Sequence, residues 1–293
     1  MSHSSVLGEP RQVEISCGPI RYRERGSGPT LVFLHGIVAN GDVWRNVVAE
    51  LASEYRCITP DWPLGSHKLG MTADADFSLP GLAAIVADFL AALELNDATL
   101  IANDTGGAIA QWVAIRHPER LGRLVLTPCD AFDNFLPPVL RHLQVFGRTT
   151  PGLWLLGTAL RSQGIQRLPI AFGRLTVRPI DAEAMRSYTR PLATNASARR
   201  DFAKFVRAVS SRYTRQAAEE LHTFDKPALV LWGLDDRLFP LAHGHRLAQR
   251  LPQGRLAVIE DAGAFVTEDQ PRHVSAVIAE FLRQDIEAGG VRV

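Results

Sequence analysis

The chain has 293 residues, 46% of them hydrophobic, and a formal net charge of +1, which allows a sizeable core and argues against a nucleic-acid-binding protein. No apolar run approaches the roughly 20 residues that a membrane span needs, and the polar stretch from Met1 to Pro10 lacks the apolar centre of a signal peptide, so we expect a cytoplasmic protein without a membrane span. The three cysteines, Cys17, Cys57 and Cys129, are scattered singly and indicate neither a disulfide framework nor a zinc cluster.

Strands and helices alternate through most of the chain. In chain order, the patterns predict strands at Val13 to Ser16, Ile20 to Arg25 and Leu31 to Leu34, a helix at Asp42 to Ser53, a strand at Tyr55 to Thr59, a helix at Leu79 to Leu93, a strand at Ala98 to Ala102, a helix at Gly107 to Arg116 and a strand at Leu121 to Thr127. Two late strands, Ala228 to Trp232 and Arg255 to Ile259, are each followed by a helical pattern, near His243 to Arg250 and Pro271 to Arg283. This alternation predicts the α/β class, with a doubly wound and mostly parallel sheet.

The stretch from residue 131 to residue 222 interrupts the alternation. It has a mostly helical pattern, so we expect a helical cap at 131–222 inserted into a core made of residues 1–130 and 223–293. A cap at that point would lie over the carboxyl ends of the strands, where open α/β sheets bind ligands. The cap holds 13 Arg and one Lys against six Asp and Glu, a net charge of +8, which leaves 1 − 8 = −7 for the rest of the chain. Such a surface is either a solvated helical face or a surface that attracts an anionic substrate or partner.

The segment Leu100-Ile101-Ala102-Asn103-Asp104-Thr105-Gly106-Gly107 joins a buried strand to a helix through a tight turn of small residues. The nucleophile elbow has the pattern Gly-x-nucleophile-x-Gly at such a turn, because helix and strand approach closely there. Ala102 and Gly106 take the two small positions, and Asp104 takes the position of the nucleophile. The alternative is that Asp104 merely caps the following helix, since Asp is a good N-cap residue.

Several further segments, together with the elbow, resemble the α/β-hydrolase superfamily over nearly the whole chain. They are Gly28-Pro29 before the third strand, His35-Gly36 after it, the turn from Trp232 to Pro240 that contains Asp235 and Asp236, and the closing segment from Asp261 to Pro271. An aspartate at the elbow narrows the resemblance toward haloalkane dehalogenases and epoxide hydrolases. In those enzymes the carboxylate attacks carbon, an alkyl-enzyme ester forms, and a water molecule activated by histidine hydrolyses the ester.

The resemblance implies roles for further residues. The backbone N–H groups of Ile37 and Thr105 would form the oxyanion hole, and His35 would be a structural residue of the adjoining loop rather than a base. The acid of a catalytic triad would be Asp236, which fits the spacing better than Asp235, or Asp130, because some relatives place the acid after the earlier strand.

The closing segment departs from the family pattern at one position. It resembles the loop Gly-His-Phe that carries the catalytic histidine, but here it reads Gly263-Ala264-Phe265, and alanine cannot activate water. Three explanations are open: an engineered variant without its base, a natural protein that has lost hydrolysis, or another histidine in the role. His67 follows a strand and could face the pocket, whereas His243 and His245 have the pattern of exposed helix residues and His273 begins the last helix.

Other departures concern the substrate. Dehalogenases of this kind hold halide with the side chains of an Asn and a Trp. This chain has Ile37 and Thr105 at those two positions. Epoxide hydrolases have Pro where this chain has Val38, and they use cap tyrosines as proton donors. Tyr188 and Tyr213 lie in the cap, where tyrosines are commonly packing residues.

Three functions therefore compete. The first is a hydrolase of a small organic substrate, with Asp104 as its nucleophile and with hydrolysis impaired or altered by the missing histidine. The second is a cofactor-free lyase, isomerase or cyclase in which Asp104 is a general base or an electrostatic anchor. The third is a binding protein that docks through its basic cap. No metal-ligand spacing and no phosphate loop is present, so no cofactor is implied, and the oligomeric state is open.

Overall fold

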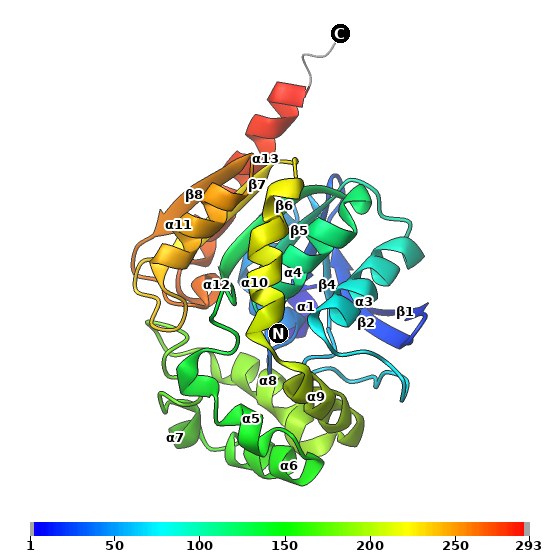
Figure 1. Cartoon of the computed structure of the whole chain (residues 1–293), viewed down its shortest axis with the longest axis vertical. Helices are drawn as coiled ribbons and strands as arrows, with labels where there is room; N and C mark the ends of the chain where they lie inside the picture. The colour runs from blue at the N-terminus through cyan, green and yellow to red at the C-terminus, as the bar shows by residue number, and fades with distance from the viewer. Residues whose placement is uncertain (1–2, 290–293) are drawn as a thin grey trace.

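An eight-stranded sheet forms the centre of the computed structural model, which describes residues 3–289 (Figure 1). The strands are β1 Pro10–Ile15, β2 Gly18–Arg25, β3 Thr30–Leu34, β4 Arg56–Pro60, β5 Ala98–Asp104, β6 Leu121–Cys129, β7 Ala228–Gly233 and β8 Gly254–Ile259. Their order across the sheet is β1-β2-β4-β3-β5-β6-β7-β8. β2 pairs antiparallel with β1 and β4, and all other neighbours are parallel. The predicted fold class, a mostly parallel α/β sheet, is confirmed.

Helices cover both faces of this sheet, which explains the apolar runs of its central strands. Every residue of β5 is buried, as expected for a parallel strand with helices on both sides. The core helices are α1 His3–Val6, α2 Arg45–Leu51, α3 Leu79–Ala92, α4 Thr105–Arg116, α10 Ser211–Glu220, α11 Leu241–Arg250, α12 Val266–Asp269 and α13 Pro271–Gly289. α3 packs beside α4 on one face, and α2 packs beside α13. The helix predicted at Asp42 to Ser53 begins with a 3₁₀ turn, Gly41–Trp44, before α2.

Most helices of the predicted cap gather at one end of the molecule, at the bottom of Figure 1. They are α5 Leu143–Phe146, α6 Thr150–Ala159, α7 Gln163–Gln166, α8 Ala182–Thr194 and α9 Ala196–Ala208. The last helix of the predicted cap, α10, instead lies along α4, where the Trp112 indole N–H donates to the carbonyl oxygen of Tyr213. Within residues 3–289, no helix is long and apolar enough to cross a membrane.

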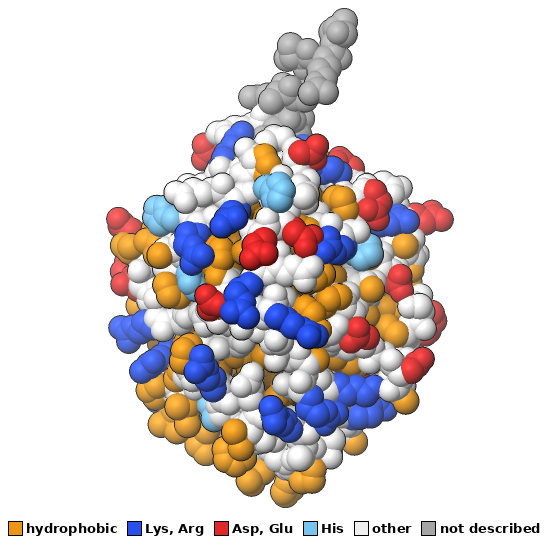
Figure 2. Space-filling view, viewed as in Figure 1, with side chains coloured by type: hydrophobic (Ala, Val, Ile, Leu, Met, Phe, Trp, Pro, Cys, Tyr) orange, Lys and Arg blue, Asp and Glu red, His pale blue; other side chains and the backbone are white. Residues whose placement is uncertain are grey.

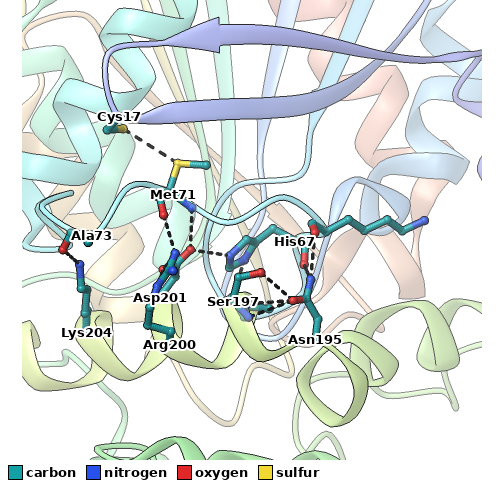
Figure 3. Close-up of polar contacts among 12 residues, drawn as sticks. Cys17, His67, Met71, Ala73, Asn195, Ser197, Arg200, Asp201 and Lys204 are labelled. Atoms are coloured by element: carbon teal, nitrogen blue, oxygen red, sulfur yellow. Dashed lines mark hydrogen bonds and ion pairs between the residues drawn. The ribbon is translucent and has the colours of Figure 1, made fainter.

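A buried aspartate connects α9 to the long loop after β4 (Figure 3). Asp201 accepts a hydrogen bond from the backbone N–H of Met71 at 2.8 Å, and His67 Nε2 lies 3.2 Å from the same carboxylate oxygen, Oδ2. Arg200 Nε donates to the other oxygen at 2.8 Å. Asn195, at the start of α9, donates to the carbonyl oxygen of Lys68 at 2.9 Å. These contacts hold α9 against the loop after β4.

The direction of chain progression across the sheet reverses between β3 and β5. The segment after β3 leads to β4 on one side, whereas the segment after β4 crosses back to β5 on the other side. The loops after β3 and β5 therefore leave the sheet in opposite directions, and the crevice between them is the usual ligand site of open α/β sheets. His35 and Asp104, two of the predicted site residues, lie at these two strand ends.

Candidate functional site

Asp104 lies at a strained turn between β5 and α4. Its backbone has φ 57° and ψ −134°, a region that a non-glycine residue occupies only when the surrounding structure holds it there. A Cβ on Gly106 would lie 2.6 Å from the carbonyl oxygen of His35, and a Cβ on Gly36 would lie 2.3 Å from the Cβ of Asp104. The two small residues therefore allow the β3 loop to pack directly against the turn, which has the geometry of a nucleophile elbow.

The Asp104 carboxylate is held by backbone donors. The N–H of Thr105 donates to Oδ1 at 2.5 Å, and the N–H of Ile37 acts on the same carboxylate as a second donor that lowers its pKa. Burial raises the pKa of Asp104, while the hydrogen bonds from Thr105 and Ile37 act to lower it. The two N–H groups predicted as an oxyanion hole thus converge on the Asp104 carboxylate itself.

A second buried carboxylate, Asp130, follows β6 and contacts the elbow through a hydroxyl. Thr105 Oγ1 donates to Asp130 Oδ2 at 2.9 Å, and Oδ1 of Asp130 has no hydrogen-bond partner among the described residues. Burial raises the pKa of Asp130 well above its usual value, and the negative charge of Asp104 raises it further. Two carboxylates so close in a buried site resist being ionised together.

The third acid, Asp236, lies in the turn after β7. Its Oδ1 accepts hydrogen bonds from the backbone N–H groups of Leu238 and Phe239, at 2.7 and 2.9 Å. Its Oδ2 is buried and has no partner among the described residues. Burial raises the pKa of Asp236 to about 7, against the two N–H bonds, and the charge of Asp104 also raises it. One oxygen is therefore fixed in place and the other is available to a cationic or N–H partner.

Ala264 is fully buried. It lies next to the turn at Asp104 and to the turn after β7 that carries Asp236. The amide of Asn103 donates to the carbonyl oxygen of Ala264 at 2.9 Å, and the N–H of Asp235 donates to the carbonyl oxygen of Ala262 at 3.0 Å. The loop that resembles the histidine loop of the family is therefore hydrogen-bonded both to Asn103, beside Asp104, and to Asp235, beside Asp236. Asn103 was not singled out from the sequence, although it directly precedes Asp104.

The histidines that could replace the missing base have other contacts. His35 is buried, with Nδ1 bonded to the Gly36 carbonyl oxygen and Nε2 accepting from the N–H of Trp62. Burial lowers the pKa of His35 to about 4, so its ring is neutral at pH 7. Its two hydrogen bonds connect the loop after β3 to the segment after β4. His67 bonds to Asp201 and accepts from the N–H of Gly65 at 3.4 Å. His243 is half-buried rather than exposed, with its ring edge-on to Phe132.

A buried ion pair below the Ala264 loop was also missed by sequence reasoning. Arg45 makes two hydrogen bonds to Glu268, at 2.6 and 2.7 Å, and the Tyr188 hydroxyl donates to the same carboxylate at 2.7 Å. The Tyr188 hydroxyl proton is therefore taken up by the hydrogen bond to Glu268. Tyr213, in α10, lies edge-on to Trp112 of α4. Glu268 lies four residues after Ala264, which was the one sequence signal that could have pointed to this pair.

No group of three or more His, Cys, Asp and Glu side chains within the described residues is arranged to hold a metal ion.

The sheet order and the strained turn between β5 and α4 define an α/β-hydrolase fold. The chain belongs to the alpha/beta hydrolase fold family, whose model matches residues 29–271. It is 28% identical to an uncharacterized hydrolase of Bacillus subtilis, over 87% of this chain and 90% of that one. It is 27% identical to haloalkane dehalogenase 2 of Mycobacterium tuberculosis, over 93% of this chain and 94% of the relative. An alpha/beta hydrolase fold protein from Burkholderia ambifaria superimposes with a TM-score of 0.75 at 24% identity, covering 94% of this chain and 97% of that one.

Proposed function

We propose that this protein is a hydrolase that forms a covalent ester between Asp104 and a small organic substrate. The observation that carries the proposal is the pair of backbone donors on the Asp104 carboxylate. A serine nucleophile would leave these donors free for a substrate carbonyl. When the nucleophile is a carboxylate, its own Cγ is the carbon that water later attacks, so the oxyanion forms on the aspartate and the donors must face it.

The first step requires an electrophilic sp³ carbon with a leaving group. One oxygen of Asp104 attacks this carbon, a C–O bond forms, and the bond to a halide or to an epoxide oxygen breaks, with the electron pair going to the leaving group. The N–H groups of Thr105 and Ile37 hold the carboxylate so that one oxygen faces the substrate. The similarity to a protein named haloalkane dehalogenase 2 supports this class of substrate.

The second step is impaired in this chain. Water attacks Cγ of Asp104, the oxyanion accepts from Thr105 and Ile37, and the alcohol leaves as the ester bond breaks. A base must accept the proton of the attacking water, and position 264 offers only a methyl group. We therefore propose that the ester forms and persists.

Asp236 is the acid that we assign to the triad position, in preference to Asp130. Its Oδ1 is fixed by two backbone N–H groups while its Oδ2 is without a partner, an arrangement suited to orienting an imidazole. Asp130 instead bonds through Thr105 to the nucleophile side of the site. The N–H of Asp235, beside Asp236, is bonded to the Ala264 loop.

The test is intact-protein mass spectrometry after incubation with a primary bromoalkane or a terminal epoxide. We expect one added alkyl or hydroxyalkyl group, mapped by peptide fragmentation to Asp104 and absent from Asp104→Asn. Asp133→Asn is a matched control for unspecific alkylation, because Asp133 is an exposed acid paired with Arg215; this variant should react as the unaltered chain does. Absence of an adduct with every such electrophile would end the covalent proposal.

The pKa of Asp236 supports a second candidate, a cofactor-free lyase or isomerase. A carboxyl group whose pKa is about 7 can give and take protons at neutral pH, and a site without a water-activating histidine suppresses hydrolysis. The two candidates differ in the source of product oxygen. Turnover in ¹⁸O-labelled water that places no label in the product or in Asp104 would favour the lyase or isomerase.

A further inference from the structure

Residues 141–180 carry positive charge without any acid. This segment of the cap holds six arginines and no Asp or Glu. Arg178 lies 3.9 Å from Asp261. The other five are exposed and form no ion pair within the described part of the chain: Arg141, Arg148, Arg161, Arg167 and Arg174. Their charge is therefore available to a partner.

The same segment exposes most of the large apolar side chains found on the described surface. Seven of them lie within it: Val145, Phe146, Trp154, Leu155, Leu168, Ile170 and Val177. Only Leu234 and Val258 lie elsewhere among residues 5–284, whose side chains the structure describes. Figure 2 shows hydrophobic side chains gathered along the lower rim of the molecule, at the end where Figure 1 places α5, α6 and α7, with basic side chains beside them. Exposed apolar patches of this kind mark interaction sites.

Helix α6 explains how the apolar surface arises. Its sequence, TPGLWLLGTA, contains no charged residue. Leu153 and Gly157 are buried toward α8 and α9, whereas Trp154 is 52% exposed and Leu155 is 59% exposed. A surface helix normally carries polar residues on its outer face, so the outer face of α6 lacks a partner within the described chain.

We propose that this face of the cap, residues 141–180, docks on an anionic lipid surface. Trp and Phe side chains favour the boundary between lipid tails and headgroups, and arginines beside them attract the phosphates of acidic lipids. A hollow of about 300 Å³ continues the surface, since Val177 lines it together with Arg167, Arg178 and the apolar Phe172 and Met185. None of the candidate catalytic residues lines this hollow, so the proposal is independent of the role of Asp104.

Charge favours lipid over a second copy of this chain. A symmetric dimer places the same patch of each copy against the other. Five unpaired arginines would then face five more, without an acid in residues 141–180 to neutralise them. A lipid surface with acidic headgroups supplies both the negative charge and the apolar layer that the exposed side chains need.

Trp154 is a built-in reporter for the test. The other four tryptophans, Trp44, Trp62, Trp112 and Trp232, are each at most 4% exposed. The unaltered protein would be mixed with phosphatidylcholine vesicles containing about 30% phosphatidylglycerol. We expect co-sedimentation, a blue shift of the tryptophan emission, and quenching by brominated lipid. In Trp154→Phe the emission change should disappear while co-sedimentation persists.

Matched variants decide which surface binds. The double variant Trp154→Ser and Leu155→Ser should weaken binding at least tenfold, whereas Leu234→Ser with Val258→Ser should bind as the unaltered chain does. Arg148→Gln and Arg161→Gln should each weaken binding about fivefold, and vesicles of phosphatidylcholine alone should bind less. The proposal is overturned by an absence of binding to the acidic vesicles, by equal binding of the cap and control double variants, or by concentration-dependent self-association that Trp154→Ser abolishes.

Discussion

The side-chain amide of Asn103 donates a hydrogen bond of 2.9 Å to the carbonyl oxygen of Ala264. Asn103 also donates to the carbonyl oxygen of Pro128 at 3.0 Å, so one residue of the elbow holds the backbone of two other loops. The direction of the Cβ at position 264 is therefore set by backbone contacts that do not depend on which side chain is present.

A histidine at position 264 should restore turnover. Because Asn103 holds the backbone, the imidazole of Ala264→His should project into the site beside Asp236. General-base catalysis raises reaction rates by about 10²- to 10⁴-fold, so the rate of hydrolysis of the Asp104 ester should rise by a factor in that range. The check is steady-state release of halide or diol. Ala264→Gln is the control, since it adds similar bulk without a base, and equal rates for the two variants would contradict the prediction.

The stability of the protein should fall as the pH rises toward 7 because of Asp236. Burial raises the pKa of Asp236 from 3.8 to about 7 in the folded state. The folded state therefore binds this proton more tightly, and the associated stability is fully present below the unfolded value of 3.8 and is lost as pH rises through the folded value. Asp236→Asn should be more stable than the unaltered chain at pH 8, by up to about 4 kcal/mol, and equal to it near pH 4.

Urea denaturation at several pH values measures this difference. Asp225→Asn changes an exposed acid in the same part of the chain and should leave the pH profile as it is. A profile of Asp236→Asn that runs parallel to that of the unaltered chain would show that Asp236 is not the group responsible.

The buried pair Arg45 and Glu268 should show strong coupling. Removing one partner leaves an uncompensated buried charge, which costs about 3–5 kcal/mol, so Arg45→Met and Glu268→Leu should each be strongly destabilised. The double variant leaves no such charge and should lose much less than the sum of the two. Free energies of unfolding for the four proteins form the double-mutant cycle, and additive losses would mean that the pair is not coupled.

Tyr188→Phe removes one hydrogen bond to Glu268 and should lower the free energy of unfolding by about 1–3 kcal/mol.

Asp201 should control how firmly α9 is held against the loop after β4. Burial opposes its ionisation, but hydrogen bonds from His67, the Met71 N–H and Arg200 outweigh it and lower the pKa of Asp201. The stability that it contributes is therefore present above the unfolded pKa and is lost as pH falls through the folded value. Asp201→Asn should cost about 1.5–3 kcal/mol.

Hydrogen exchange distinguishes a local loosening of α9 from a general loss of stability. In Asp201→Asn, amides of α9 and of residues 65–78 should exchange faster, while those of the central strands β3 and β5 should change less. Uniform acceleration across the sheet would contradict a local role for Asp201.

The sequence by itself determined the class of fold and the order of its elements. Strands such as Leu31 to Leu34 and Ala98 to Ala102 were predictable because a parallel strand covered on both faces needs a continuous apolar run, which is a local signal. The strained turn at Asp104 was predictable for the same reason, since small residues at fixed spacing are a local requirement of a tight connection between strand and helix. The absence of a histidine at position 264 is likewise a property of the sequence alone.

Only the tertiary structure decided which polar groups meet. Asn103 and Ala264 are 161 residues apart and Arg45 and Glu268 are 223 apart, and no local pattern predicts such pairs, because folding alone brings their strands and helices together. Burial raised the pKa of Asp104, Asp130 and Asp236, which depends on solvent exclusion by distant segments. The exposure of Trp154 was decided in the same way, because an apolar helix is expected to be covered until its neighbours in space are known.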